Sequence, residues 1–483
     1  MAQHSRLSTA PPPSAPARES TRHLLLRAHI VLLLFCVLAH TAVFNLIGID
    51  GAAVVLAVLL LGTLGLAIPR IVMARPARFP WRRMPWAALT YLLLALASVL
   101  WSRWPEATLL TWVLQASITA VALFIAFTLT WQEIVRALSS AFKWIIGLSI
   151  LLEAWVALVL HHPLIPNFAQ FPPGKIDPHW YWVRGDLLGT GRIQGIVGNS
   201  NTLGILCAFA LVVFGLLYAE RARRRPALLV WIVLAGFLFV RAGSATAFAA
   251  FAVGVLVLLA ALVMRRAERP GQRGHRYALF AGLAVLGAVV VWLGRGVLFG
   301  LLGKSSDLTY RVEIWRKVWA RAIEHPIFGN GFSSPWVPWD PAFHDWILDH
   351  RITVFMAHDM WLDVFLQLGA VGVLLIAIAF AAFAWRAWFF AIDRPRWDLV
   401  KDRPFSALSL LPTVIVAMLL VLGIAESTPI MLWGWLLLIL LSFKLKISPF
   451  VGTGFGEEAP PETRGAARRK AEARRRRARG RTA

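Results

Sequence analysis

A histidine and two aspartates stand together at the start of a long apolar run. His358 and Asp359 are adjacent, Asp363 follows, and the sequence then stays mainly apolar to about residue 385. Histidine exchanges a proton readily near neutral pH, so this position could supply a general base. The alternative is a structural histidine that is hydrogen-bonded where a helix meets the edge of a membrane.

An arginine occupies the apolar face of a predicted helix. The stretch SSDLTYRVEIWRKVWARAIEHPIFGNGF predicts a helix that begins at residue 306 or 307 and stops just before Pro326. Helical spacing places four residues on one face: Arg311, Trp315, Val318 and Ala322. An arginine in such a face needs an anionic partner or many hydrogen bonds. A bound anion and a structural ion pair both meet that need.

A second arginine lies in the glycine-rich stretch GDLLGTGRIQGIVGNSN. Arg192 has glycines on both sides, and Asn199 and Asn201 follow at the start of an apolar run. Glycine lets the backbone approach a ligand closely, and a helix N-terminus favours anions. Glycine-rich turns before helices are common, but together Arg192 and Arg311 offer two guanidinium groups that could hold a phosphate or diphosphate.

The elements that must position these residues are membrane helices. Hydrophobic residues make up 58% of the 483 residues, and charged residues only 15%. The mean hydropathy is +0.66, which excludes an ordinary soluble domain. We expect an all-α polytopic bundle of about twelve spans, at residues 24–43, 51–68, 86–101, 108–130, 141–160, 196–218, 227–241, 243–264, 277–298, 358–385, 405–424 and 428–446.

The distribution of basic residues predicts the orientation. Arginines gather in the connections near 70–83, 221–225, 265–276 and 394–403, so those connections and both termini are expected in the cytoplasm. The predicted parts are a cytoplasmic segment 1–23, a transmembrane unit 24–446 and a basic tail 447–483. The tail could bind anionic lipid headgroups or be only a solvated tail, and nucleic-acid binding is a poor account of its charge. Two long loops, about 161–195 and 299–357, then face outward.

Four features in chain order resemble the O-antigen ligase and polymerase superfamily of bacterial envelope glycosyltransferases. They are Arg192 before Gly-Asn-Ser-Asn, Arg311 in Arg-Val-Glu-Ile-Trp, the segment His-Pro-Ile-Phe-Gly-Asn-Gly-Phe at 325–332, and His-Asp-x9-Gly-x-x-Gly from His358 to Gly372. The resemblance covers about residues 192–372. One departure is Asp359, where many members carry an amide or hydroxyl.

This resemblance implies a GT-C-like enzyme with a helical periplasmic loop in the inner membrane of a Gram-negative bacterium. Its donor would be an undecaprenyl-diphosphate-linked O-antigen polysaccharide, and its acceptor a sugar hydroxyl of lipid A–core. His358 would be the general base, and Arg192 and Arg311 would bind the donor diphosphate. Transfer would invert the anomeric configuration by direct attack.

Four further residues are candidates for orienting or supporting this site: Asp359, Asn199, Asn201 and Trp315. No cofactor is expected. Three aspartates in the second long loop, at positions 340, 345 and 349, are spaced too irregularly to predict a metal site. Arginine is therefore the expected electrostatic catalyst.

Two other functions remain open from the sequence. An O-antigen polymerase, or an oligosaccharyltransferase that modifies protein hydroxyls, would use the same scaffold. A transporter or flippase for lipid-linked sugar is the alternative from another class, with Glu153 as its main mid-membrane charge. No inverted repeat is apparent, and the candidate charges lie mainly in the outer loops.

Overall fold

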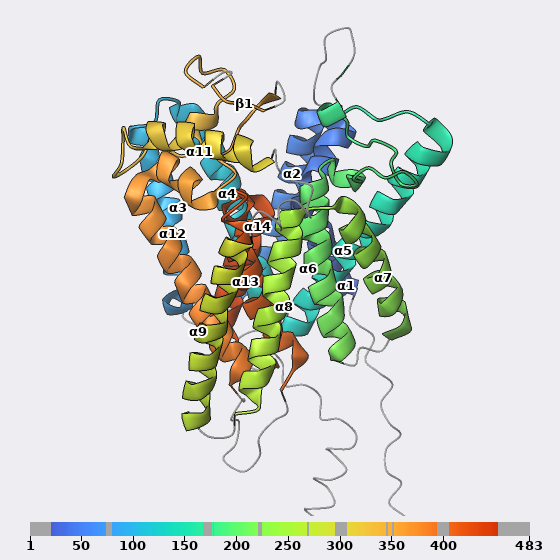
Figure 1. Ribbon diagram of the computed structural model, residues 1–483, viewed down its shortest axis with the longest axis vertical. Coiled ribbons are helices and arrows are strands. Elements are labelled where there is room, and N and C mark those ends of the chain that lie inside the picture. Colours follow the sequence, from blue (N-terminus) through green and yellow to red (C-terminus); the bar gives the residue numbers. More distant parts are fainter. Residues whose placement is uncertain are drawn as a thin grey trace, which may run out of the picture.

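The computed structural model describes residues 21–73, 80–167, 176, 178–220, 225–267, 270–294, 307–343, 346–349, 352–393 and 405–452. Most of the basic tail, and the N-terminal segment up to residue 20, lie outside these residues. Figure 1 shows the described helices standing side by side along the long axis of the molecule, with one helix, α11, lying across one end.

The described part of the chain is almost entirely helical. Its α-helices are α1 Thr21–Leu38, α2 His40–Met73, α3 Trp86–Ala97, α4 Pro105–Thr128, α5 Trp131–Trp155, α6 Ser200–Ala219, α7 Arg225–Ala242, α8 Ala245–Arg265, α9 Pro270–Leu293, α11 Asp307–Ala322, α12 Met360–Ile392, α13 Leu411–Leu422 and α14 Leu432–Ile447. Two short strands, β1 Leu348–Asp349 and β2 Ile352–Thr353, pair antiparallel. Every apolar run expected from the sequence overlaps one of these helices.

Seven helices in the described residues are long and apolar enough to cross a membrane: α2, α4, α5, α6, α7, α8 and α12. Shorter apolar helices lie within 23–38, 86–100 and 407–422. Large side chains on the outside of the bundle are well exposed, including Leu110 at 73%, Val233 at 68% and Leu256 at 64%. Such a surface suits lipid, so the chain is a multi-pass membrane protein. Twelve crossings and a GT-C-like architecture remain predictions.

Helix α11 packs on the end of the bundle through the predicted apolar face. Val318 and Ala322 are fully buried, Ile314 adds to the same face, and Trp315 packs against this cluster. The helix contacts the first part of α12, and the β1–β2 hairpin lies near it at the same end of the molecule (Figure 1). This cluster fixes α11 relative to the start of α12, where His358 lies.

Helix α12 is broken at Gly369, which has φ +64°. The break frees backbone groups that bond to the segment after α11: Ala370 N donates to Pro326 O at 2.8 Å, and Gly331 N donates to Gln367 O at 2.9 Å. A Cβ on Gly369 would lie 2.3 Å from the carbonyl carbon of Ile327. Gly369 is therefore in close contact with the backbone of the segment 325–332.

Candidate active site

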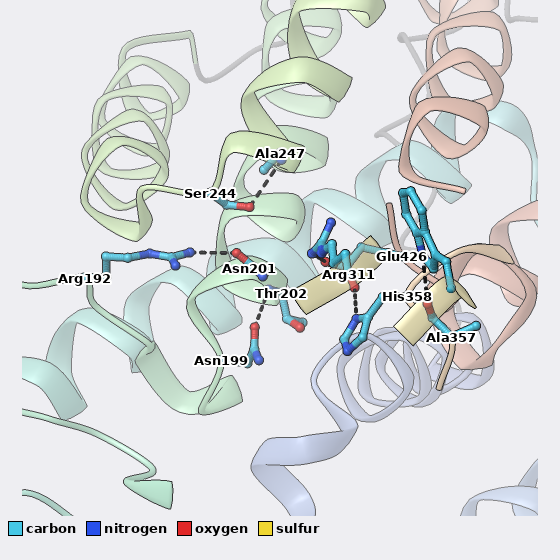
Figure 2. A network of polar contacts seen from close by, with 11 residues as sticks. Arg192, Asn199, Asn201, Thr202, Ser244, Ala247, Arg311, Ala357, His358 and Glu426 are labelled. Carbon is cyan, nitrogen blue, oxygen red and sulfur yellow. Dashed lines mark hydrogen bonds and ion pairs between the residues drawn. The ribbon is translucent and has the colours of Figure 1, made fainter. Parts of the chain in front are cut away.

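A buried glutamate joins the two strongest candidates from the sequence. Glu426 Oε1 lies 3.2 Å from Arg311 Nη2, and Glu426 Oε2 lies 3.4 Å from His358 Nδ1. The three side chains come from α11, from the residue before the N-cap of α12, and from the turn after α13. Figure 2 shows them converging beside one another. A base, a cation and a carboxylate are thus brought together.

The burial of Glu426 makes this arrangement chemically significant. Its side chain is 8% exposed, whereas those of Arg311 and His358 are 19% and 29% exposed. A buried carboxylate is costly unless it is paired, and here one oxygen faces a guanidinium and the other an imidazole. The glutamate can therefore hold a proton on Nδ1 of His358, which leaves Nε2 as the basic nitrogen.

The backbone of His358 is held in an unusual conformation. Its φ is +51°, in the left-handed region that costs a residue with a side chain about 1–3 kcal/mol. Neighbouring contacts hold it there: Trp315 Nε1 donates to Ala357 O at 3.1 Å, and Met360 N donates to Gly423 O at 2.8 Å. Trp315 therefore contacts the backbone next to His358, and its supporting role in the site stays a prediction. The backbone conformation of His358 and the contact with Glu426 therefore both fix the position of the ring.

The two aspartates near His358 have separate structural contacts. Asp359 is the N-cap of α12 and accepts from Leu362 N at 2.8 Å. Burial raises the pKa of its carboxyl, although the backbone N–H groups that it accepts from oppose the rise. Asp363 is 1% exposed and accepts from Trp336 Nε1 at 2.7 Å. The carboxylate in contact with the His358 ring is that of Glu426, and Asp359 instead orients the helix that follows.

Arg192 belongs to a second cluster of polar side chains. Its Nε donates to Ala242 O at 2.8 Å, and its Nη2 donates to Asn201 Oδ1 at 2.7 Å. Asn199 is the N-cap of α6 and accepts from Thr202 N at 3.0 Å. Figure 2 shows this group and the Glu426 group in one view, on separate elements. Asn201 therefore contacts Arg192 and Asn199 caps α6, while a role for either asparagine in catalysis stays a prediction.

The part of the chain that contains Arg311 and His358 matches a known protein family. Residues 230–377 match the protein-family model described as O-antigen ligase. This segment is an O-antigen ligase family domain. It contains Arg311, His358, Gly369 and Gly372, whereas Arg192 and Glu426 lie outside it. Among curated proteins, none matches the chain.

Glu153 positions the loop that carries Arg192. It lies near the end of α5, is fully buried, and its Oε1 accepts from Gln194 N at 2.9 Å and from Gly195 N at 2.8 Å. Gly195 sits against Ser149, where a Cβ would lie 2.5 Å from the hydroxyl oxygen. The charge that suggested a transport pathway is thus engaged with the loop backbone two and three residues after Arg192.

Carboxylates and histidines do not gather as a metal site in the described ranges. No group of three or more histidine, cysteine, aspartate or glutamate side chains that could hold an ion occurs among those residues. Asp340 is fully buried and accepts from Trp104 Nε1 at 2.7 Å. Asp345 lies outside the described residues. Metal independence stays a prediction.

Glu426 was not identified from the sequence, although a signal for it exists. It is the only acidic residue between Asp402 and Glu457, and it falls in the short gap between two apolar runs, 405–424 and 428–446. An ionisable residue at the edge of a membrane helix is a functional candidate with a partner to be named. That partner, His358, is 68 positions away in the sequence, so only the fold identifies it.

Proposed function

We propose that this protein is an O-antigen ligase that transfers polysaccharide from undecaprenyl diphosphate to a hydroxyl of lipid A–core. The observation that carries the proposal is the Arg311–Glu426–His358 arrangement, because it joins a cation for a leaving group to an oriented base. The family segment, residues 230–377, contains both Arg311 and His358. The site would face the periplasm. Basic residues in loops on that side are not explained by the positive-inside rule, so a role in binding an anionic donor would account for them.

In the proposed reaction His358 activates the acceptor. The hydroxyl oxygen attacks the anomeric carbon of the donor, and its proton passes to Nε2 of His358. The bond between the anomeric carbon and the diphosphate oxygen breaks, and its electron pair stays on that oxygen. Glu426 stabilises the imidazolium that forms, as a carboxylate does for a catalytic histidine. A single displacement inverts the configuration at the anomeric carbon.

Arg311 serves the leaving group. Glu426 engages Nη2, and the guanidinium fork carries further N–H donors that can meet phosphate oxygens in a bidentate way. Arg192 would supply a second guanidinium, positioned by Asn201 and by the backbone of Ala242. Fixed cations would thereby stabilise the charge that develops on the departing diphosphate without a metal ion.

The proposal is tested with purified protein in liposomes that contain lipid-linked polysaccharide and lipid A–core, in the presence of excess EDTA. His358→Ala should lower ligation by ~10²–10⁴-fold, the usual cost of losing a positioned base. His325→Ala is the control, because His325 is exposed at the end of the same α11 region. Near-normal ligation by the His358 variant would refute the assignment.

The acceptor decides between ligase and related activities. Parallel reactions receive a second lipid-linked sugar or a pilin-type protein instead of lipid A–core. Transfer to the lipid-linked sugar alone would make the protein a polymerase, and transfer to protein alone an oligosaccharyltransferase. Movement of the donor across the bilayer without any transfer would support the transporter alternative and overturn the proposal.

A further inference from the structure

A groove lies between α1 and α5, away from the candidate active site. It has a volume of about 650 Å³, within the range of small-molecule sites. Its walls are mainly apolar, with Val31, Phe35 and Leu148 among the lining residues. Among the described residues that line it, two are charged, and both are arginines: Arg27 and Arg136. The groove therefore combines an apolar channel with two positive charges.

The register of the two helices places those arginines together at one end. His23 Nε2 and Glu133 Oε1 are 2.6 Å apart, which brings the first turns of α1 and α5 into contact. Arg27 and Arg136 follow these residues by four and three positions, one helical turn further along each helix. The apolar lining residues come mainly after them on both helices. At the α-helical rise, the lining from Arg27 to Phe35 covers about 12 Å along α1, and that from Arg136 to Leu148 covers about 18 Å along α5. Both lengths are shorter than a ~30 Å hydrocarbon core.

The arginine end of the groove and Glu153 lie at opposite ends of α5. Arg136 is in the second turn of α5, whereas Glu153, which holds the Arg192 loop, is 17 positions later. At 1.5 Å per residue this separation is about 26 Å, close to the thickness of the hydrocarbon core. A molecule bound at the two arginines would thus enter the membrane from the opposite side to the donor and acceptor.

We propose that this groove binds an anionic glycerophospholipid, with its phosphate at Arg27 and Arg136 and one acyl chain along Val31 and Phe35. Guanidinium groups bind phosphate oxygens in a fork geometry that suits a headgroup at the membrane surface. Glu133 lies one turn before Arg136, and its carboxylate is engaged by His23 and by the capping box at Thr130. An acyl chain can bury its apolar surface in this channel, whereas a free phosphate has no apolar surface to bury.

Native mass spectrometry of the full chain tests the proposal. Wild-type protein is equilibrated with equimolar phosphatidylglycerol and phosphatidylcholine, and the two bound lipids are compared. One basic residue near an anionic headgroup is worth about fivefold in binding, so the double change Arg27→Gln and Arg136→Gln should lower the phosphatidylglycerol preference about thirtyfold. Arg82→Gln with Arg266→Gln is the matched control, since both arginines are exposed and lie outside the groove.

A second variant tests the channel without changing charge. Ser140 lines the groove, so Ser140→Phe should fill it and displace the bound lipid. Glycerol phosphate without acyl chains should not compete with the lipid. Equal binding of the two lipids by wild type, equal losses in the groove and control pairs, or full lipid retention by the Ser140 variant would overturn the proposal. A stable dimer that the Ser140 variant disrupts would also overturn it, because a second copy would then be the occupant.

Discussion

Replacing Glu426 by glutamine removes the negative charge of the side chain and keeps its size and shape almost unchanged. The side chain keeps an oxygen and a nitrogen in place, but it loses the negative charge shared by Arg311 and His358. In the proposed reaction that charge stabilises the imidazolium formed when His358 takes the acceptor proton. We therefore expect the change mainly in kcat, with KM for the donor little affected.

The size of the effect follows from the geometry. A hydrogen bond to a charged partner contributes about 1.5–3 kcal/mol, and each 1.36 kcal/mol of barrier is a factor of ten, so kcat should fall about 10- to 150-fold. The larger loss known for a triad aspartate changed to asparagine, ~10⁴-fold, is not expected. The contact between Glu426 Oε2 and His358 Nδ1 is 3.4 Å, longer than a strong charge-assisted hydrogen bond.

The assay is initial-rate ligation in liposomes at varied donor concentration, with folding of each variant checked by size-exclusion chromatography. Glu313→Gln is the matched control, because Glu313 is an exposed glutamate of α11 that pairs with Lys317 at 3.4 Å. A kcat within twofold of wild type for folded Glu426→Gln protein would refute the role of its charge. A rise in KM with unchanged kcat would show that Glu426 acts through Arg311 and the donor instead.

Three further outcomes are expected. Arg311→Lys should lower kcat/KM for the donor roughly tenfold or more, because an ammonium does not reproduce the guanidinium fork. Arg316→Lys, on the exposed face of α11, should stay near wild type, and equal activities of the two variants would contradict the assignment. Gly369→Ala should lower the thermal unfolding midpoint in detergent, since φ is +64° and the new Cβ would lie 2.3 Å from the Ile327 backbone. Gly282→Ala, with open space around it, should leave the midpoint unchanged, and similar midpoints of the two variants would refute the close contact at Gly369. Asp359→Asn should raise the midpoint at pH 8, because a raised folded-state pKa means that the ionised carboxyl opposes folding, and asparagine caps a helix equally well. That gain should shrink as the pH falls through the raised folded-state pKa towards the ordinary value of 3.8, and a gain independent of pH would contradict the reasoning.

Local patterns in the sequence predicted the helices well, because helix formation depends on residues close together in the chain. The apolar face of α11 is confirmed at Val318 and Ala322, because helical spacing alone determines which residues share a face. Glu313 and Lys317, four positions apart, form an ion pair for the same reason. The close contact at Gly369 also has a local cause, since a glycine inside an apolar helix leaves room for a neighbouring backbone to approach.

Partners distant in the sequence could not be predicted in this way. Nothing in the spacing around His358 indicates Glu426, because the contact depends on how α13 ends beside α12. The break of α12 at Gly369 was likewise not expected, since its apolar run continues through it without a proline. Asp359, adjacent to His358 in the sequence, faces the helix backbone because an N-cap side chain turns toward the first free N–H groups.

The late position of Glu426 has a consequence for how the protein is made. Arg311 precedes it by 115 residues and His358 precedes it by 68. At ordinary synthesis rates of ~5–20 residues per second, the carboxylate is polymerised roughly 3–14 s after the histidine. Until then the nascent chain has the imidazole of His358 without the carboxylate that contacts it. If the proposed function holds, chains truncated before the turn after α13 would contain most of the helices and yet lack a complete site, so activity would begin only when the bundle is nearly complete.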